Sequence, residues 1–203
     1  MSDPGLVLLP SLTAALLFLL TRHRAPYPGS AVIKALGCAL LAAVAWPVQP
    51  WLALALALSA MGDWFLALGG DRHFRRGLIA FLCAHLVYIG IFALAWSPLP
   101  GSFAGAVAIT FAGLALLVWL YPDLGEMRPA VLAYTLVIVA MTVTALLSAY
   151  PAPVLVPGAL LFMFSDFCIA VRRFKRDFPL GGELTWAAYY SGQLLIFLAL
   201  IAA

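Results

Sequence analysis

Hydrophobic residues along this chain gather into long runs, which short polar or Pro/Gly-marked connections separate. The runs approach the about 20 residues that a helix needs to cross a bilayer. The pattern therefore predicts an all-α fold, a polytopic membrane helix bundle with eight transmembrane helices. The predicted helices cover residues 5–21, 31–46, 51–68, 77–96, 101–121, 129–149, 154–171 and 184–202.

The composition agrees with a membrane protein. Hydrophobic residues make up 66% of the chain and charged residues 9%, whereas a soluble domain has about 45–50% and about 25%. The connections are too short to fold alone, so we expect a single integral-membrane domain over residues 1–203. Any chemistry must then come from side chains of the bundle or of its short loops.

Two further features bear on processing and redox state. The first apolar run has no basic segment before it, so we expect a retained first helix and not a cleaved signal peptide. Cys38, Cys83 and Cys168 lie in apolar runs without a CxxC pair. We expect buried thiols, because this spacing supports neither a disulfide framework nor a metal site.

Basic residues lie almost entirely in alternate connections. The first, third, fifth and seventh connections hold every Lys and Arg except Lys34, which follows the first connection closely. Because cytoplasmic loops accumulate Lys and Arg, we expect these connections in the cytoplasm and both termini outside it. The net charge of +3 then indicates topology and contact with anionic lipid, not nucleic-acid binding. The Ala-rich, compact chain is typical of a bacterial inner-membrane protein.

Two carboxylates stand inside apolar runs. Asp63 and Asp166 lie 103 residues apart in similar contexts, and the other acidic residues lie at the terminus or in polar connections. An intramembrane charge costs roughly 2.5–3.5 kcal/mol on insertion scales and is a candidate functional group. Both lie about 8–10 Å from the cytoplasmic ends of their helices at about 1.5 Å per residue. The spacing suggests a parallel internal repeat of four plus four helices.

Other polar side chains are expected near that depth. His85 and Tyr88, spaced i, i+3, share one helix face. Each residue also has a structural interpretation: a protonated Asp can tie helices together for about 0.6–2 kcal/mol, Lys34 can snorkel to the interface, and the tyrosines can belong to the interfacial belt or core. The set comprises Lys34, Ser59, His85, Tyr88, Ser165, Tyr189, Tyr190 and Gln193.

Motifs for metal or cofactor chemistry are not found in the sequence. It has no HxxxH or HExxH spacing, no Gly-rich phosphate loop and no GxSxG motif. We therefore expect no metal site and no cofactor, and serine-hydrolase chemistry has weak support.

An ordered set of short motifs comprises Gly62-Asp63 with Leu66, His85-Leu86-Val87-Tyr88, Ser165-Asp166 and Tyr189-Tyr190-Ser191-Gly192-Gln193. This set resembles the YhhN-type lysoplasmalogenase family of multi-spanning membrane proteins. Lys34 also fits, although Ala35 follows it where the family pattern often has Pro. The resemblance implies an ether hydrolase that cleaves the vinyl ether bond of lysoplasmalogen, a lysophospholipid, to a fatty aldehyde and glycerophosphoethanolamine or glycerophosphocholine.

Such a reaction needs an acid and a base, as glycoside cleavage does. We hypothesise that Asp63 and Asp166 form this catalytic pair without a metal. In the same hypothesis, catalytic His85, Tyr88, Tyr190 and Gln193 position water and the ether oxygen, and substrate-binding Lys34, Ser59, Ser165 and Tyr189 contact the lipid.

Two other functions remain open at this stage. A proton-coupled transporter of lipids or small amphiphiles would also use paired intramembrane carboxylates and a repeat, although Pro residues cluster at helix ends and break no helix at mid-membrane. A non-catalytic lipid-binding protein would use the Asp pair only to hold helices together.

Overall fold

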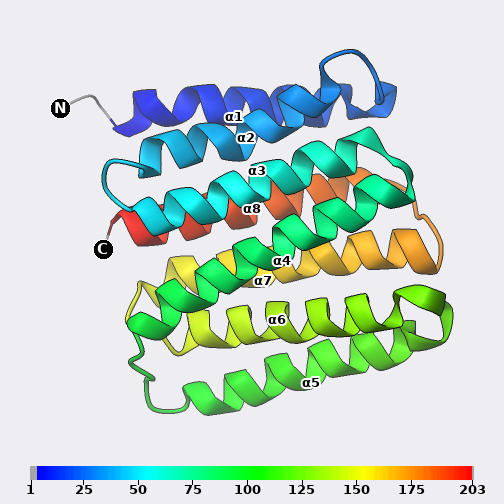
Figure 1. The fold of residues 1–203 in the computed structure, drawn as a ribbon. Helices are drawn as coiled ribbons and strands as arrows, with labels where there is room; N and C mark the ends of the chain where they lie inside the picture. The colour runs from blue at the N-terminus through cyan, green and yellow to red at the C-terminus, as the bar shows by residue number, and fades with distance from the viewer. Residues whose placement is uncertain (1–3, 203) are drawn as a thin grey trace. The chain divides into compact units, whose positions relative to one another are not determined.

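The computed structural model describes residues 4–202, and its regular structure over this range is helical, with one isolated bridge between Trp96 and Ser148. Figure 1 shows the eight α-helices of this range. They are α1 (Pro4–Thr21), α2 (Ser30–Ala45), α3 (Pro50–Leu68), α4 (Gly70–Leu94), α5 (Ser102–Leu120), α6 (Arg128–Leu146), α7 (Ala152–Phe174) and α8 (Gly181–Ile201).

Six of the helices within residues 4–202 are long and apolar enough to cross a membrane, namely α3 to α8. Helix α2 is apolar but shorter, with 16 residues. The prediction of an all-α integral membrane protein is confirmed. The number of membrane crossings stays a prediction.

The predicted helix boundaries match the structure closely at most ends. The prediction was wrong at the start of α4, because residues 69–76 were assigned to a connection and the helix already begins at Gly70. Its first turns carry charged residues beyond the apolar run. Asp71 lies in the first turn, where a carboxylate interacts favourably with the helix dipole.

The helices cluster into two compact units, one up to Val87 and one from Tyr88 onward, so the division falls within α4. In the first unit, α1 packs on α2 and α2 on α3 (Figure 1). The hydroxyl of Ser11 donates to the carbonyl of Gly37, 2.6 Å away, and so joins α1 to α2. Helix α4 approaches α3 at glycine, since a Cβ on Gly77 would lie 2.9 Å from Leu66 Cδ2.

The second unit is built on the packing of α7 against α8, with α6 against both α5 and α7. Glycines permit the closest approach. A Cβ on Gly192 of α8 would lie 2.8 Å from the carbonyl oxygen of Gly158 and 2.9 Å from the nitrogen of Phe162, both in α7. Only glycine therefore fits at position 192 without a shift of the two backbones.

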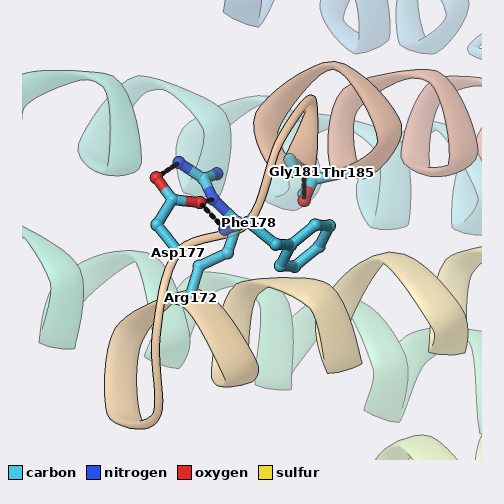
Figure 2. Close-up of polar contacts among 5 residues, drawn as sticks. All are labelled: Arg172, Asp177, Phe178, Gly181 and Thr185. Carbon is cyan, nitrogen blue, oxygen red and sulfur yellow. Dashed lines mark hydrogen bonds and ion pairs between the residues drawn. The ribbon is translucent and has the colours of Figure 1, made fainter.

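An ion pair joins the last turn of α7 to the connection that leads to α8 (Figure 2). Arg172 Nε lies 2.6 Å from Asp177 Oδ1, which also accepts the backbone N–H of Phe178 at 2.9 Å. On the α8 side, Thr185 donates to the carbonyl of Gly181, 2.6 Å away. Arg172 and Arg173 lie in the last turn of α7, where positive charge complements the helix dipole.

Candidate functional site

A buried ion pair lies within the first unit. Lys34 Nζ of α2 is 3.4 Å from Asp63 Oδ1 of α3, and their side chains are 15% and 2% exposed. Helix α2 packs on α3, which brings the second turn of α2 beside the carboxylate. An ion pair requires an ionised Asp63, so this carboxylate can accept a proton or stabilise a cation.

Two buried aromatic rings lie close to this part of α2 and α3. Phe18 of α1 is buried, and Lys34 Nζ lies 5.9 Å from its ring centroid. Phe81 of α4 is also buried and packs against Gly62, where a Cβ would lie 2.5 Å from Phe81 Cε2. Glycine beside Asp63 thus admits an aromatic ring, and the low-dielectric surroundings strengthen electrostatic interactions with the carboxylate.

Ser59 and His85 are both fully buried. The Ser59 hydroxyl donates to the carbonyl of Ala55, 2.9 Å away, which is the common back-bond of a serine within a helix. His85 Nδ1 lies 2.6 Å from the carbonyl oxygen of Phe81. Because a carbonyl can only accept, Nδ1 carries the proton, and a neutral His85 accepts on Nε2.

The second intramembrane carboxylate has a hydroxyl partner. Tyr134 of α6 donates from Oη to Oδ2 of Asp166 over 2.6 Å. Ser165 Oγ lies 3.5 Å from Asp166 Oδ1 and donates over 2.9 Å to the carbonyl of Phe162. Asp166 and Tyr134 are half-buried, so the carboxylate is less enclosed than Asp63.

A third polar contact lies in the second unit, at Gln193 of α8. Tyr88 donates from Oη to Gln193 Oε1, 2.7 Å away, and both side chains are fully buried. Tyr189 packs edge-on against Phe162 with ring centroids 5.3 Å apart, and Tyr190 stacks on Trp186 at 6.1 Å. The hydrogen bond fixes the amide of Gln193, while the tyrosines form an aromatic layer.

The structure thus brings predicted site residues together in three groups: Lys34 with Asp63, Ser165 with Asp166, and Tyr88 with Gln193. Ser59 and His85 bond to carbonyls of their own helices, and Tyr189 and Tyr190 pack with aromatic rings.

Sequence reasoning missed one residue, Tyr134. It lies in an apolar run and in the second turn of α6, as Lys34 does in α2. Tyr134 therefore lies at the same expected depth as Lys34, because both helices were expected to start in the cytoplasm, but depth alone does not indicate its contact with Asp166.

Comparisons with known proteins agree with the family resemblance of the sequence. The profile of the YhhN family matches residues 29–200. A lysoplasmalogenase of Mycobacterium bovis is 39% identical over 168 residues, which cover 76% of this chain and 63% of the relative. Lysoplasmalogenase TMEM86B of Mus musculus is 34% identical over 177 residues, covering 84% of this chain and 74% of the relative. The chain thus spans 63% of the length of the mycobacterial relative. No solved structure matches it.

Proposed function

Because this chain belongs to the YhhN family, we propose that it is a membrane-embedded hydrolase that cleaves the vinyl ether bond of a lysoplasmalogen. The products are a fatty aldehyde and glycerophosphoethanolamine or glycerophosphocholine. Similarity to lysoplasmalogenases from bacteria and from mouse supports this substrate class. The buried ion pair of Lys34 with Asp63 is the structural observation that carries the proposal.

The reaction has three steps. A proton adds to the vinyl carbon that is β to the ether oxygen, and the π electrons form the new C–H bond and leave an oxocarbenium ion. Water adds to the cationic carbon and releases a proton, which gives a hemiacetal. The hemiacetal hydroxyl then gives up its proton as its oxygen forms the C=O bond. The bond to the glycerol oxygen breaks, that oxygen takes up a proton, and the fatty aldehyde leaves. One water is consumed overall.

Asp63 suits the cationic stage of this reaction. Its charge is held by Lys34 inside an apolar surrounding, where a fixed carboxylate is worth more to a developing cation than it would be in water. As in glycoside cleavage, such a group can accept the proton of the attacking water. Lys34 holds Asp63 in this role and, at 15% exposure, retains limited access to a lipid phosphate.

The other predicted residues have supporting roles in this reaction. Asp166 is the second carboxyl, with Ser165 beside it. We assign His85, Tyr88, Tyr190 and Gln193 to the orientation of water and of the ether oxygen, because hydrogen bonds hold the imidazole and the amide in fixed positions. Ser59 and Tyr189 are assigned to contacts with the lipid.

The membrane topology is part of the proposal. We place all eight helices across a bacterial inner membrane, with both termini outside the cytoplasm and the single-chain lipid entering from the cytoplasmic leaflet. A parallel repeat is supported by one correspondence: the carboxyls of α3 and α7 each contact a side chain from the second turn of the preceding helix, Lys34 in α2 and Tyr134 in α6.

The direct test is release of free aldehyde from a lysoplasmalogen by the purified protein in detergent. We expect Asp63→Asn and Asp166→Asn each to lower turnover by at least about 100-fold, the lower range for loss of a general acid or base. The control is Asp123→Asn, which removes a carboxylate paired with Lys175 at the end of α7 and should leave turnover unchanged.

Three results would count against the proposal. Turnover within tenfold of the unsubstituted protein in both variants, with folding intact, would remove the two carboxyls from the mechanism. No aldehyde release over several headgroups and pH values would reject this substrate class. Uptake of lipid into sealed liposomes without aldehyde release would instead identify a transporter.

A further inference from the structure

We propose that Tyr134 is a positioning residue for Asp166, fixing one carboxyl oxygen so that the other exchanges the proton of the reaction. This inference deepens the proposed function and rests on it. It assigns a role to a residue outside the set that the sequence motifs selected.

The contact has the geometry of a strong hydrogen bond. Tyr134 Oη lies 2.6 Å from Asp166 Oδ2, within the range of about 2.5–2.7 Å that is typical when a hydroxyl donates to a carboxylate. The two residues come from α6 and α7, which pack directly against each other. Both lie in the second unit, so the contact is internal to one compact part of the chain.

The two carboxyl oxygens of Asp166 therefore differ. Oδ2 accepts the phenol, whereas Oδ1 has Ser165 Oγ at 3.5 Å, a hydroxyl that donates over 2.9 Å to the carbonyl of Phe162. A bond of 2.6 Å constrains the plane of the carboxyl group far more than one of 3.5 Å. We assign the proton that is transferred to Oδ1.

The partner of each carboxyl indicates its task. Asp63 pairs with an ammonium group, which requires a carboxylate. Asp166 bonds to a neutral phenol, which can donate to Oδ2 whether Oδ1 carries a proton or not. Asp166 is thus compatible with the acid step: the Oδ1–H bond breaks, its proton forms the new C–H bond, and the electron pair remains on the carboxylate. The hydrogen bond from Tyr134 persists through this change.

The experiment compares Tyr134→Phe with Tyr27→Phe. Each removes one phenolic hydroxyl and keeps the ring, and the hydroxyl of Tyr27 shares an equally short bond, 2.6 Å, with Thr21 outside the site. We expect Tyr134→Phe to lower kcat by about 10- to 100-fold, as loss of a hydrogen bond to a charged group does, with KM within about twofold. Tyr27→Phe should change neither.

A double-mutant cycle distinguishes positioning from a general structural role. If Tyr134 acts through Asp166, then Tyr134→Phe lowers the residual kcat of Asp166→Asn by less than about twofold. An equal 10- to 100-fold loss in both backgrounds would overturn the inference, since it would show that the hydroxyl acts independently of the carboxyl.

A second measurement does not require activity. Infrared spectra identify the carboxyl band of Asp166 as the one that disappears in Asp166→Asn, and this band should shift in Tyr134→Phe but not in Tyr27→Phe. An unshifted band overturns the inference, whether or not the protein releases aldehyde. A shifted band in a protein that releases no aldehyde would reject the proposed function and leave Tyr134 as the residue that orients Asp166.

Discussion

At the residue scale, the Lys34–Asp63 pair is held in an environment that tolerates neither charge alone. Taking two ions out of water is expensive, and their attraction offsets this only with good geometry. Lys34 Nζ and Asp63 Oδ1 are 3.4 Å apart, and buried aromatic rings lie near them. Its contribution to folding is therefore modest, whereas loss of one partner leaves a buried, uncompensated charge.

Replacing Lys34 by Met should accordingly destabilise the protein by about 3–5 kcal/mol. The free energy of unfolding, measured in mixed detergent micelles, checks this. The matched control is Lys175→Met, because Lys175 also pairs with an aspartate, Asp123, but that aspartate is 38% exposed. A partly exposed pair contributes about 0–1 kcal/mol, so the control should lose much less.

A second substitution should restore part of the lost stability. Adding Asp63→Asn to Lys34→Met removes the uncompensated charge, so the double variant should be more stable than Lys34→Met alone. If Lys34→Met is as stable as the unsubstituted protein, the ion pair has no structural role. If the double variant loses more than the single one, buried charge is not the cause of the loss.

At the element scale, glycine decides how near two helices approach. Between α7 and α8, the atoms that a Cβ on Gly192 would meet belong to backbone, at 2.8 Å and 2.9 Å, so no flexible side chain can yield. Gly90 of α4 is exposed, and a Cβ there would meet nothing within 4 Å. Both glycines lie within helices, but only Gly90 has room for a Cβ.

We therefore expect Gly192→Ala to lower the thermal unfolding temperature and Gly90→Ala to leave it unchanged or raise it. Within a helix, alanine is intrinsically more favourable than glycine by about 0.8–1 kcal/mol, so the loss at Gly192 has to exceed this gain. A melt in detergent of both variants is the measurement. Equal shifts in the two variants would contradict the close approach of α7 and α8.

The helices themselves were largely predictable, because apolar runs near the length of a bilayer crossing leave few alternatives. The start of α4 was not, since hydropathy reports the membrane boundary and not the helix boundary, and residues 70–76 are helical but polar. Contacts between helices were harder still. Tyr134 was overlooked because its role depends on which face of α6 packs on α7, and an almost uniformly apolar helix does not reveal that face in its sequence.

At the scale of the whole molecule, a parallel repeat would account for the two similar motifs that carry the intramembrane carboxyls. Asp63 and Asp166 could be selected from the sequence because a charge in an apolar run is rare. Their different partners, an ammonium group and a phenol, could not be, because they depend on helix register. Similar motifs with unlike partners would give a duplicated framework two carboxyls of unlike chemistry, which is what an acid and a base require.

Helix α2 is the best place to test the topology, because it is the shortest of the helices that are expected to cross the membrane. With 16 residues, this helix extends about 24 Å at about 1.5 Å per residue, less than the about 30 Å of a hydrocarbon core. If α2 crosses the membrane, the connection before it lies in the cytoplasm, as the positive charges of Arg22 and Arg24 favour. If α2 does not cross, that connection lies outside the cytoplasm, because the start of α3 is expected on the outer side and α2 would then remain on the same side.

Cysteine labelling in intact bacterial cells distinguishes these cases. In a background without Cys38, Cys83 and Cys168, we expect Leu99→Cys to react with an impermeant maleimide, and Pro28→Cys and Pro179→Cys to react only after permeabilisation; all three positions are exposed. Labelling of Pro28→Cys together with Leu99→Cys before permeabilisation would show that α2 lies on the outer face of the membrane and does not cross it. The number of membrane crossings would then be lower than eight. Labelling of Pro179→Cys but not Leu99→Cys would show that the protein has the opposite orientation. The polar half of the helices would then lie in the outer leaflet.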